Sequence, residues 1–100
     1  MGYAASGYPT VGVGSTIHSE PYRELLTLLR ERRRTAGLNQ ADLAARIGRR
    51  QTWLSKVETG ERRIDVEELR QLCVAMDVDF LDFVRKWLKS ISKSQGSLLP

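Results

Sequence analysis

Apolar residues recur at intervals of three and four from residue 20 to residue 91. This spacing is typical of amphipathic helices, and no stretch shows the sustained apolar–polar alternation that marks a strand. The pattern predicts five helices, over residues 20–35, 40–47, 51–59, 65–76 and 80–91. We therefore expect an all-α domain without a sheet.

Capping residues indicate where several of these helices begin. Asn39 with Asp42, and Asp65 with Glu68, have the spacing of a capping box, in which the first side chain accepts a hydrogen bond from the backbone three residues later. Asp79 precedes the last helix in the same way. These signals support the helix starts expected from the apolar spacing.

The most informative segment is residues 39–60, NQADLAARIGRRQTWLSKVETG. Two short helices meet there at Gly48, because glycine adopts the left-handed conformation that ends a helix and turns the chain. Gly60 ends the second helix. This arrangement predicts a helix-turn-helix, a motif whose second helix lies in the DNA major groove.

The second of these helices has two unlike faces. At about 100° per residue, Leu54 and Val57 form the buried face, with Trp53 and Glu58 at its borders. The opposite arc contains Gln51, Thr52, Ser55, Lys56 and Thr59. Glutamine can read adenine, and the other side chains suit base edges or phosphates. A solvated face is the common alternative, but it usually mixes Glu with Lys, so the acid-free arc favours DNA recognition.

The segments LNQADLAARIG and QTWLSKVETG resemble the DNA-binding domains of lambdoid phage repressors, Cro proteins and Xre-type bacterial regulators. The resemblance covers about residues 23–87. Its most specific marks are Leu38, Gln40, Leu43, Ala44, Gly48, Ser55, Val57, Glu58 and Gly60. It implies a five-helix, repressor-like fold whose helix-turn-helix binds double-stranded DNA.

The resemblance also implies roles for single residues. Gln40 would grip a phosphate, and Glu58 would pair with Arg33 on the first helix. Base edges would be contacted by Gln51, Thr52 and, one turn further on, Lys56.

Two positions depart from the family pattern. Arg50 stands where many relatives carry a Ser or Thr cap, so we expect no side-chain cap there; with Arg49 it would clamp phosphates or contact guanine. Trp53 replaces a residue that is often small or Tyr in relatives. We expect its ring to pack between the two helices rather than to contact the sugar-phosphate backbone of DNA. The candidate DNA-binding residues are Gln40, Arg49, Arg50, Gln51, Thr52, Trp53, Ser55, Lys56 and Thr59.

Charge is distributed unevenly along this chain of net charge +4. Residues 30–63 contain ten basic and four acidic residues, a balance of +6, whereas residues 64–84 contain one basic residue and six acids, a balance of −5. A positive helix-turn-helix beside a negative flank would orient the molecule on a polyanion. We expect the positive excess to add phosphate affinity and salt dependence.

Residues suited to other chemistry are scarce. His18 and Cys73 are the only His and Cys, and they form neither a metal-ligand cluster nor a nucleophile–base pair. We therefore expect that the protein is not an enzyme and that it binds no cofactor, metal or small-molecule substrate. Cys73 shares an apolar helical face with Leu69, Leu72 and Met76, which predicts a buried thiol. A single cysteine also favours a reducing compartment, the cytoplasm.

The ends of the chain differ from its centre. Residues 1–19 lack Asp, Glu, Lys and Arg and are interrupted by Gly, Ser and Pro, which predicts a flexible arm rather than a secretory signal or a membrane span. Residues 91–100 are expected to form a flexible tail. The predicted DNA-binding domain therefore spans residues 20–90.

The last helix carries a second functional signal. An apolar stripe contains Phe80, Phe83, Val84, Trp87 and Ile91, with Leu81 and Leu88 beside it. A small domain needs only part of this stripe for its core, so we expect the last two turns to project past the globule. The predicted dimer interface consists of Phe83, Trp87, Leu88 and Ile91. The alternative is that Trp87 only closes the core.

Together these features predict a sequence-specific transcriptional regulator that binds a short palindrome as a homodimer, with repression favoured over activation. A restriction-modification controller or an antitoxin-type regulator remains an alternative, because both use such compact domains. A protein-binding adaptor that uses the stripe of the last helix is another. It would have no need of an acid-free recognition face, which weighs against it.

Overall fold

The computed structural model describes residues 19–94, which fold into helices without a strand. The helices are α3 (Glu20–Thr35), α4 (Gln40–Arg46), α5 (Gln51–Thr59), α6 (Val66–Ala75) and α7 (Phe80–Ser94). The predicted all-α class and all five helices are confirmed. None of the helices within residues 19–94 is both long and apolar enough to cross a membrane.

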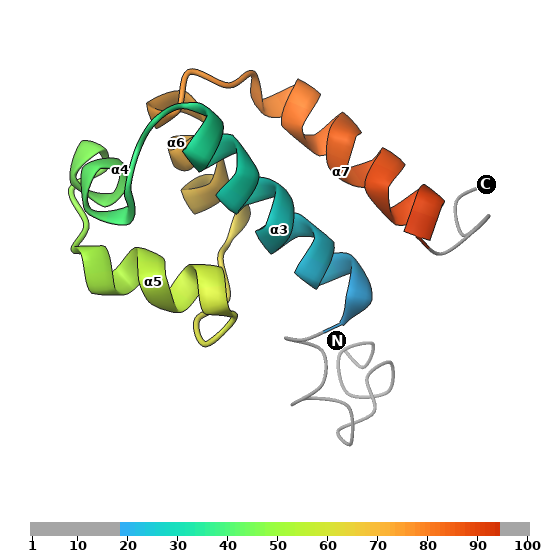
Figure 1. The fold of residues 1–100 in the computed structure, drawn as a ribbon, viewed down its shortest axis with the longest axis horizontal. Helices are drawn as coiled ribbons and strands as arrows, with labels where there is room; N and C mark the ends of the chain where they lie inside the picture. Colours follow the sequence, from blue (N-terminus) through green and yellow to red (C-terminus); the bar gives the residue numbers. More distant parts are fainter. Residues whose placement is uncertain (1–18, 95–100) are drawn as a thin grey trace, which may run out of the picture.

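Helix α3 is the central element of the domain (Figure 1). It contacts α7 along one side and α5 on another, while α4 and α5 pack against each other and α6 contacts α4 and α7. All five helices contribute side chains to one core. The largest side chains that are fully enclosed are Leu29, Leu43, Leu54, Val57, Leu72, Cys73 and Phe83. This single core fixes α5 relative to the rest of the domain.

The predicted helix starts are present as hydrogen bonds. The carboxamide oxygen of Asn39 accepts a hydrogen bond from the backbone N–H three residues later, at 2.8 Å. The carboxylate of Asp79 accepts one in the same way, at 3.0 Å. Asp65 and Glu68 form the complete capping box, with bonds of 2.7 and 3.1 Å. Arg50 makes no side-chain capping bond at the start of α5, as its residue type predicts.

Helix α7 lies against α3 up to its C-terminal turns. The indole Nε1 of Trp87 donates to the Pro21 carbonyl oxygen at 2.8 Å, and the Ser90 hydroxyl donates to the Glu24 carboxylate at 2.6 Å. These bonds join residues 66 positions apart and hold the second half of α7 on the first turns of α3. The prediction that the last two turns of this helix project past the globule is therefore wrong.

This packing changes the expected dimer interface. Phe83 and Ile91 are only 2% and 7% exposed, and Trp87 is half-buried, so these three residues belong to the protomer's own core. A 100-residue chain uses more of the stripe than we expected, because the long α3 offers a surface along most of α7. Leu88 alone of the four predicted residues stays substantially exposed, at 38%.

The predicted tail boundary is also wrong. Helix α7 continues to Ser94, and the buried side chain of Ile91 holds this last part on the domain. The predicted arm, apart from Ser19, and the final part of the predicted tail lie outside the described residues.

Candidate nucleic-acid interface

The turn between α4 and α5 depends on Gly48. Its φ of 71° lies in the left-handed region, while a Cβ at this position would meet nothing within 4 Å. Backbone conformation, not lack of space, therefore favours glycine here. The N–H groups of Gly48 and Arg49 donate to the carbonyls of Ala45 and Ala44 at 3.1 and 2.9 Å, which closes α4 and redirects the chain into α5.

Helix α5 turns its polar arc outward. Leu54 and Val57 are completely buried, as the periodicity predicts. Ser55 is half-buried, and the exposed members of the arc are Gln51, Thr52, Lys56 and Thr59. Glu58, expected at the border of the buried face, is instead only 3% exposed. The exposed surface of α5 consequently contains no carboxylate.

The buried carboxylate of Glu58 joins α5 to α3 and α4. Arg33 donates to it twice, from Nε at 2.7 Å and from Nη2 at 3.0 Å, and Gln40 Nε2 donates at 2.8 Å. Arg30 Nη2 adds a bond to the Glu58 carbonyl oxygen at 3.0 Å. The Arg33–Glu58 pair implied by the family resemblance is confirmed.

These contacts determine the charge state of Glu58. Burial is the largest single influence and raises its pKa, but the hydrogen bonds from Arg33 and Gln40 and the charges of Arg33 and Arg30 outweigh it. The pKa of this carboxyl group therefore lies below its ordinary value of 4.5. Glu58 is ionised at neutral pH and holds Arg33 and Gln40 in place.

Gln40 and Gln51 are joined to each other across the turn. Gln51 Nε2 donates to Gln40 Oε1 at 2.7 Å, while Gln40 Nε2 donates to Glu58. A chain of side chains thus runs from the core, through Arg33 and Glu58, to the first residue of α5. Because each group in the chain restrains the next, the exposed Gln51 side chain is oriented before any ligand arrives.

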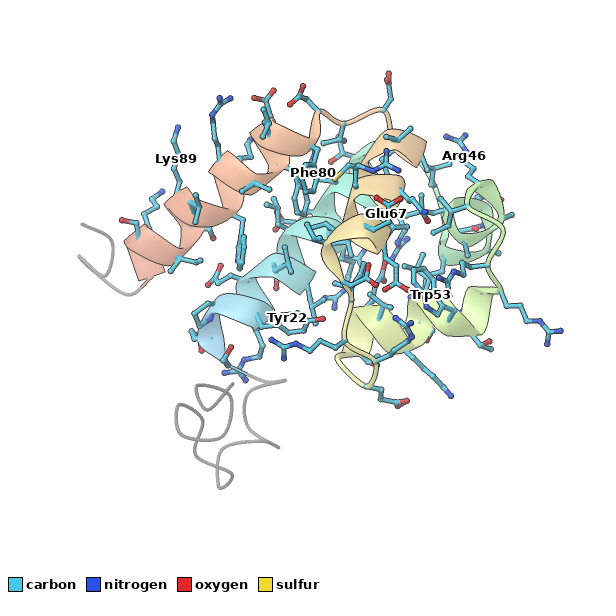
Figure 2. All side chains as sticks on the ribbon, turned by 180° about the vertical axis from the view of Figure 1, so that it is seen from behind. Tyr22, Arg46, Trp53, Glu67, Phe80 and Lys89 are labelled. Atoms are coloured by element: carbon cyan, nitrogen blue, oxygen red, sulfur yellow. The ribbon has the colours of Figure 1, made fainter. Side chains whose placement is uncertain are left out.

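A second cluster surrounds Trp53, on the side of α5 that faces α6 (Figure 2). The guanidinium groups of Arg49 and Arg62 lie over its ring, 4.5 and 5.5 Å from the centroid. Both arginines also donate to the Glu68 carboxylate, Arg49 at 3.0 Å and Arg62 at 3.0 and 3.1 Å. Hydrogen bonds from Arg62, opposed by burial, lower the pKa of Glu68.

This cluster bears on two of the candidate DNA-binding residues. The half-buried ring of Trp53 packs against the core, and its Nε1 is enclosed without a partner among residues 19–94. Arg49 is held by Glu68 and Trp53 rather than extended into solvent. The sequence shows Glu68 only as a capping residue, because its partners lie 19 and 6 positions away.

Two cations remain on the exposed side of the helix-turn-helix. Arg50 precedes α5 and Lys56 lies one turn into it, both exposed and without an ion pair among the described residues. Thr59 donates from its hydroxyl to the Lys56 carbonyl at 3.2 Å. The face therefore combines paired glutamines, hydroxyl groups and two free positive charges.

Comparison with known proteins identifies this arrangement. The model of the helix-turn-helix domain family matches residues 24–82. The chain belongs to this family. A solved XRE-family like protein from Pseudomonas syringae pv. tomato str. DC3000 is 40% identical, with a TM-score of 0.70 over 79% of this chain and 96% of that chain. A comparison with curated proteins finds no match.

The matched region of this Xre-type domain includes the whole of α4, the turn and α5, together with most of α3, all of α6 and the start of α7. The fold is therefore that of a helix-turn-helix regulator that binds DNA.

Proposed function

We propose that this protein is a sequence-specific transcriptional regulator that reads a short palindromic operator as a homodimer and represses by occluding a promoter. The observation that carries the proposal is the acid-free outer face of α5, from which Glu58 is withdrawn into the core. A carboxylate on that face would repel phosphates, whereas the hydroxyl, amide and ammonium groups present there suit base edges and phosphates. The DNA of the cytoplasm is the expected partner, and no cofactor is required.

Gln51 is the residue proposed to read a base. Its carboxamide can pair with adenine through one donor and one acceptor, and its bond to Gln40 holds it at the N-terminal end of α5. Gln40 in turn is proposed to bond a phosphate while it supports Gln51. Thr52 and Lys56 extend the reading face, and Ser55 and Thr59 border it.

Phosphate affinity is proposed to come first from the exposed Arg50. It lies beside the start of α5, where no side-chain cap occupies the first N–H groups of the helix, so a phosphate there would also meet the positive end of the helix dipole. Arg49 already neutralises Glu68, and we therefore assign it a smaller share than Arg50. Trp53 acts as a packing residue in this proposal.

The homodimer is proposed to form through the outer flank of α7. Leu81 is 60% exposed, Leu88 lies two turns further along on the same flank, and the half-buried Val84 lies between them. An antiparallel pair of α7 helices would place Leu81 against the partner's Leu88. The arrangement is self-complementary, as a twofold axis requires.

Charge supports the same arrangement. Acidic residues gather at the start of α7, with Asp77 and Asp79 exposed, and the exposed Lys93 lies near its other end. Antiparallel pairing would bring the acidic end of each helix near the basic end of the other. A dimer of this kind can present two recognition helices about 34 Å apart, the spacing of successive major grooves.

A restriction-modification controller or an antitoxin would use the same DNA-binding surface, and the neighbouring genes would separate these from an isolated repressor. The protein-binding adaptor has less support, because it gives no role to the Gln40–Gln51 pair or to the acid-free face.

Selection from a pool of random DNA duplexes, at about 50 mM and about 200 mM salt, tests the proposal. We expect an enriched palindrome and affinity that falls steeply as salt rises. Salt-sensitive binding without enrichment would contradict sequence-specific regulation, and absence of binding at low salt would favour the adaptor.

A further inference from the structure

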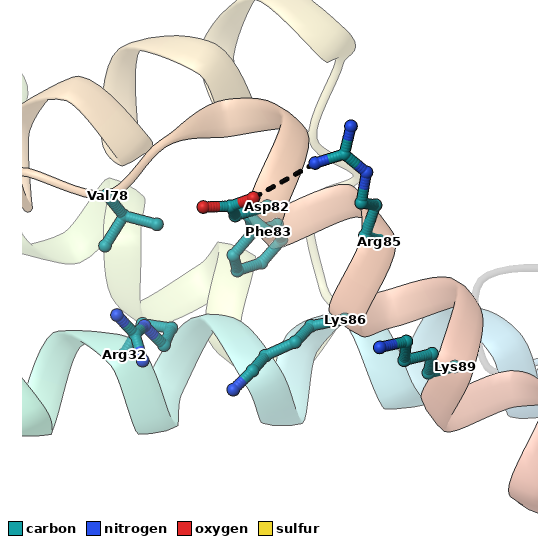
Figure 3. A pocket seen from close by; sticks show the side chains of 7 residues that line it. All are labelled: Arg32, Val78, Asp82, Phe83, Arg85, Lys86 and Lys89. Atoms are coloured by element: carbon teal, nitrogen blue, oxygen red, sulfur yellow. Dashed lines mark hydrogen bonds and ion pairs between the residues drawn. The ribbon is translucent and has the colours of Figure 1, made fainter.

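A hollow between α3 and α7 is separate from the DNA-binding face (Figure 3). Its volume is about 320 Å³, and its apolar lining comes from Val78 and Phe83. The remaining lining is one acid, Asp82, and four basic residues: Arg32, Arg85, Lys86 and Lys89. None of these residues takes part in the helix-turn-helix described above.

Most of this positive charge is uncompensated. Arg85 points away from α3 and pairs with Asp82 at 3.1 Å (Figure 3). Arg32, Lys86 and Lys89 form no ion pair with any group among residues 19–94. Three like charges around one hollow repel one another, so an anion bound there would be favoured.

The hollow lies on a different side of α3 from α5. Arg30 and Arg33 both bond to Glu58 of α5, whereas Arg32, between them in the sequence, lines the hollow with residues of α7. Figure 1 shows α5 and α7 on different sides of α3. A duplex held by α5 would therefore leave the hollow open to another molecule.

The donors in the hollow suit carboxylates better than a phosphate cradle. Arg32 lies in the last turn of α3, where the free backbone groups of the helix are carbonyls rather than the N–H groups that cradle a phosphate. Lys86 and Lys89 are exposed, flexible point charges on the side of α7, without the backbone N–H groups that phosphate sites use. Val78 adds an apolar surface between the cations.

We propose that this hollow binds an acidic segment of a partner protein, with carboxylates on Arg32, Lys86 and Lys89 and an apolar side chain against Val78. The segment binds at the same time as DNA. This inference does not depend on which operator α5 reads.

The test is fluorescence anisotropy of a labelled peptide of alternating glutamate and leucine, titrated with the full chain. Arg32→Glu and Lys86→Glu are compared with Arg34→Glu, which makes the same charge change in the same turn of α3 but does not line the hollow. Thermal melts show whether each variant is folded, and Lys86→Gln is the milder substitute if a glutamate variant is not. A peptide with glutamine in place of glutamate is the ligand control.

We expect Arg32→Glu and Lys86→Glu to weaken peptide binding about tenfold or more, and Arg34→Glu to stay within about twofold of wild type. A saturating DNA duplex should leave the peptide bound. Equal losses in Arg32→Glu and Arg34→Glu, displacement by the duplex, or no binding of the glutamate peptide would each overturn the inference. Binding of tripolyphosphate but not of the peptide would also overturn it, in favour of a phosphate ligand.

Discussion

Gln51, the first residue of α5, donates from its carboxamide to Gln40, the first residue of α4, at 2.7 Å. This bond spans the turn of the helix-turn-helix and connects the proposed base-reading side chain to the buried Arg33–Glu58 pair through Gln40. A residue proposed to contact the backbone of DNA therefore also orients the residue proposed to read its bases.

Gln40→Ala is accordingly expected to affect more than one phosphate contact. It should weaken binding to every sequence, because a phosphate partner is lost, and also reduce discrimination at the base read by Gln51. In a double-mutant cycle, Gln40→Ala and Gln51→Ala should be coupled by about 0.5–3 kcal/mol in duplex binding. Strict additivity of the two substitutions would show that the bond has no function on DNA.

Loss of Arg33 should destabilise the fold strongly. Arg33→Ala leaves the Glu58 carboxylate buried with only Gln40 and the more distant Arg30, so we expect a loss of about 3–5 kcal/mol in the free energy of unfolding. The matched control is Asp82→Ala, which removes the exposed Arg85 pair and should cost under about 1 kcal/mol. Urea unfolding followed by circular dichroism measures both, and equal costs would contradict the structural role of Glu58.

Acid should destabilise the protein through Glu58 and Glu68. Both pKa values are lower in the folded protein than the ordinary 4.5, so the unfolded chain binds protons more readily. Their stabilisation is present above about pH 4.5 and is lost as the pH falls through the folded pKa values. The free energy of unfolding should decrease as the pH is lowered from about 6 to about 3, which is roughly the range of carboxyl titration. The decrease should be smaller in Glu58→Gln.

The parts of this fold that sequence predicts well are those set by local chemistry. The caps at Asn39, Asp65 and Asp79, the left-handed glycine in the turn and the buried Leu54 each depend on residues within a few positions of one another. Periodicity also identified the exposed arc of α5, since one face of a helix can be assigned without knowledge of its partner.

Long-range packing explains what the sequence did not predict. The apolar stripe of α7 is visible in the sequence, but how much of it α3 covers depends on bonds such as Trp87 to Pro21, 66 residues apart. The Trp53 cluster also depends on long-range packing. From the sequence alone, its arginines could equally have faced DNA. A stripe identifies an apolar surface without showing whether the core or a partner covers it.

Substitutions on the two flanks of α7 should therefore separate stability from association. Trp87→Ala should lower the free energy of unfolding by about 2–3 kcal/mol. This is somewhat less than the loss expected for a fully buried tryptophan, because Trp87 is half-buried. Leu88→Glu should change stability by less than about 0.5 kcal/mol while it weakens the dimer. Sedimentation with parallel thermal melts measures both effects. A wild-type protein that stays monomeric at high concentration would rule out the proposed interface.

Cys73 should report on unfolding without affecting it. Its side chain is fully buried, and burial raises the pKa of the thiol to about 11. At about pH 8, close to the ordinary thiol pKa, we expect iodoacetamide not to react with the native protein. In urea we expect complete alkylation of this cysteine, which mass spectrometry detects as a single addition. Rapid native labelling would contradict the packing of α6 on the core.

A comparison of the duplexes selected by wild type and by Gln51→Ala shows whether α5 reads DNA sequence through Gln51. We expect Gln51→Ala to relax the preference at one position in each half of the palindrome, at a cost of about 1–3 kcal/mol, and to leave the other positions unchanged. An identical base preference in the two selections would contradict this role of Gln51.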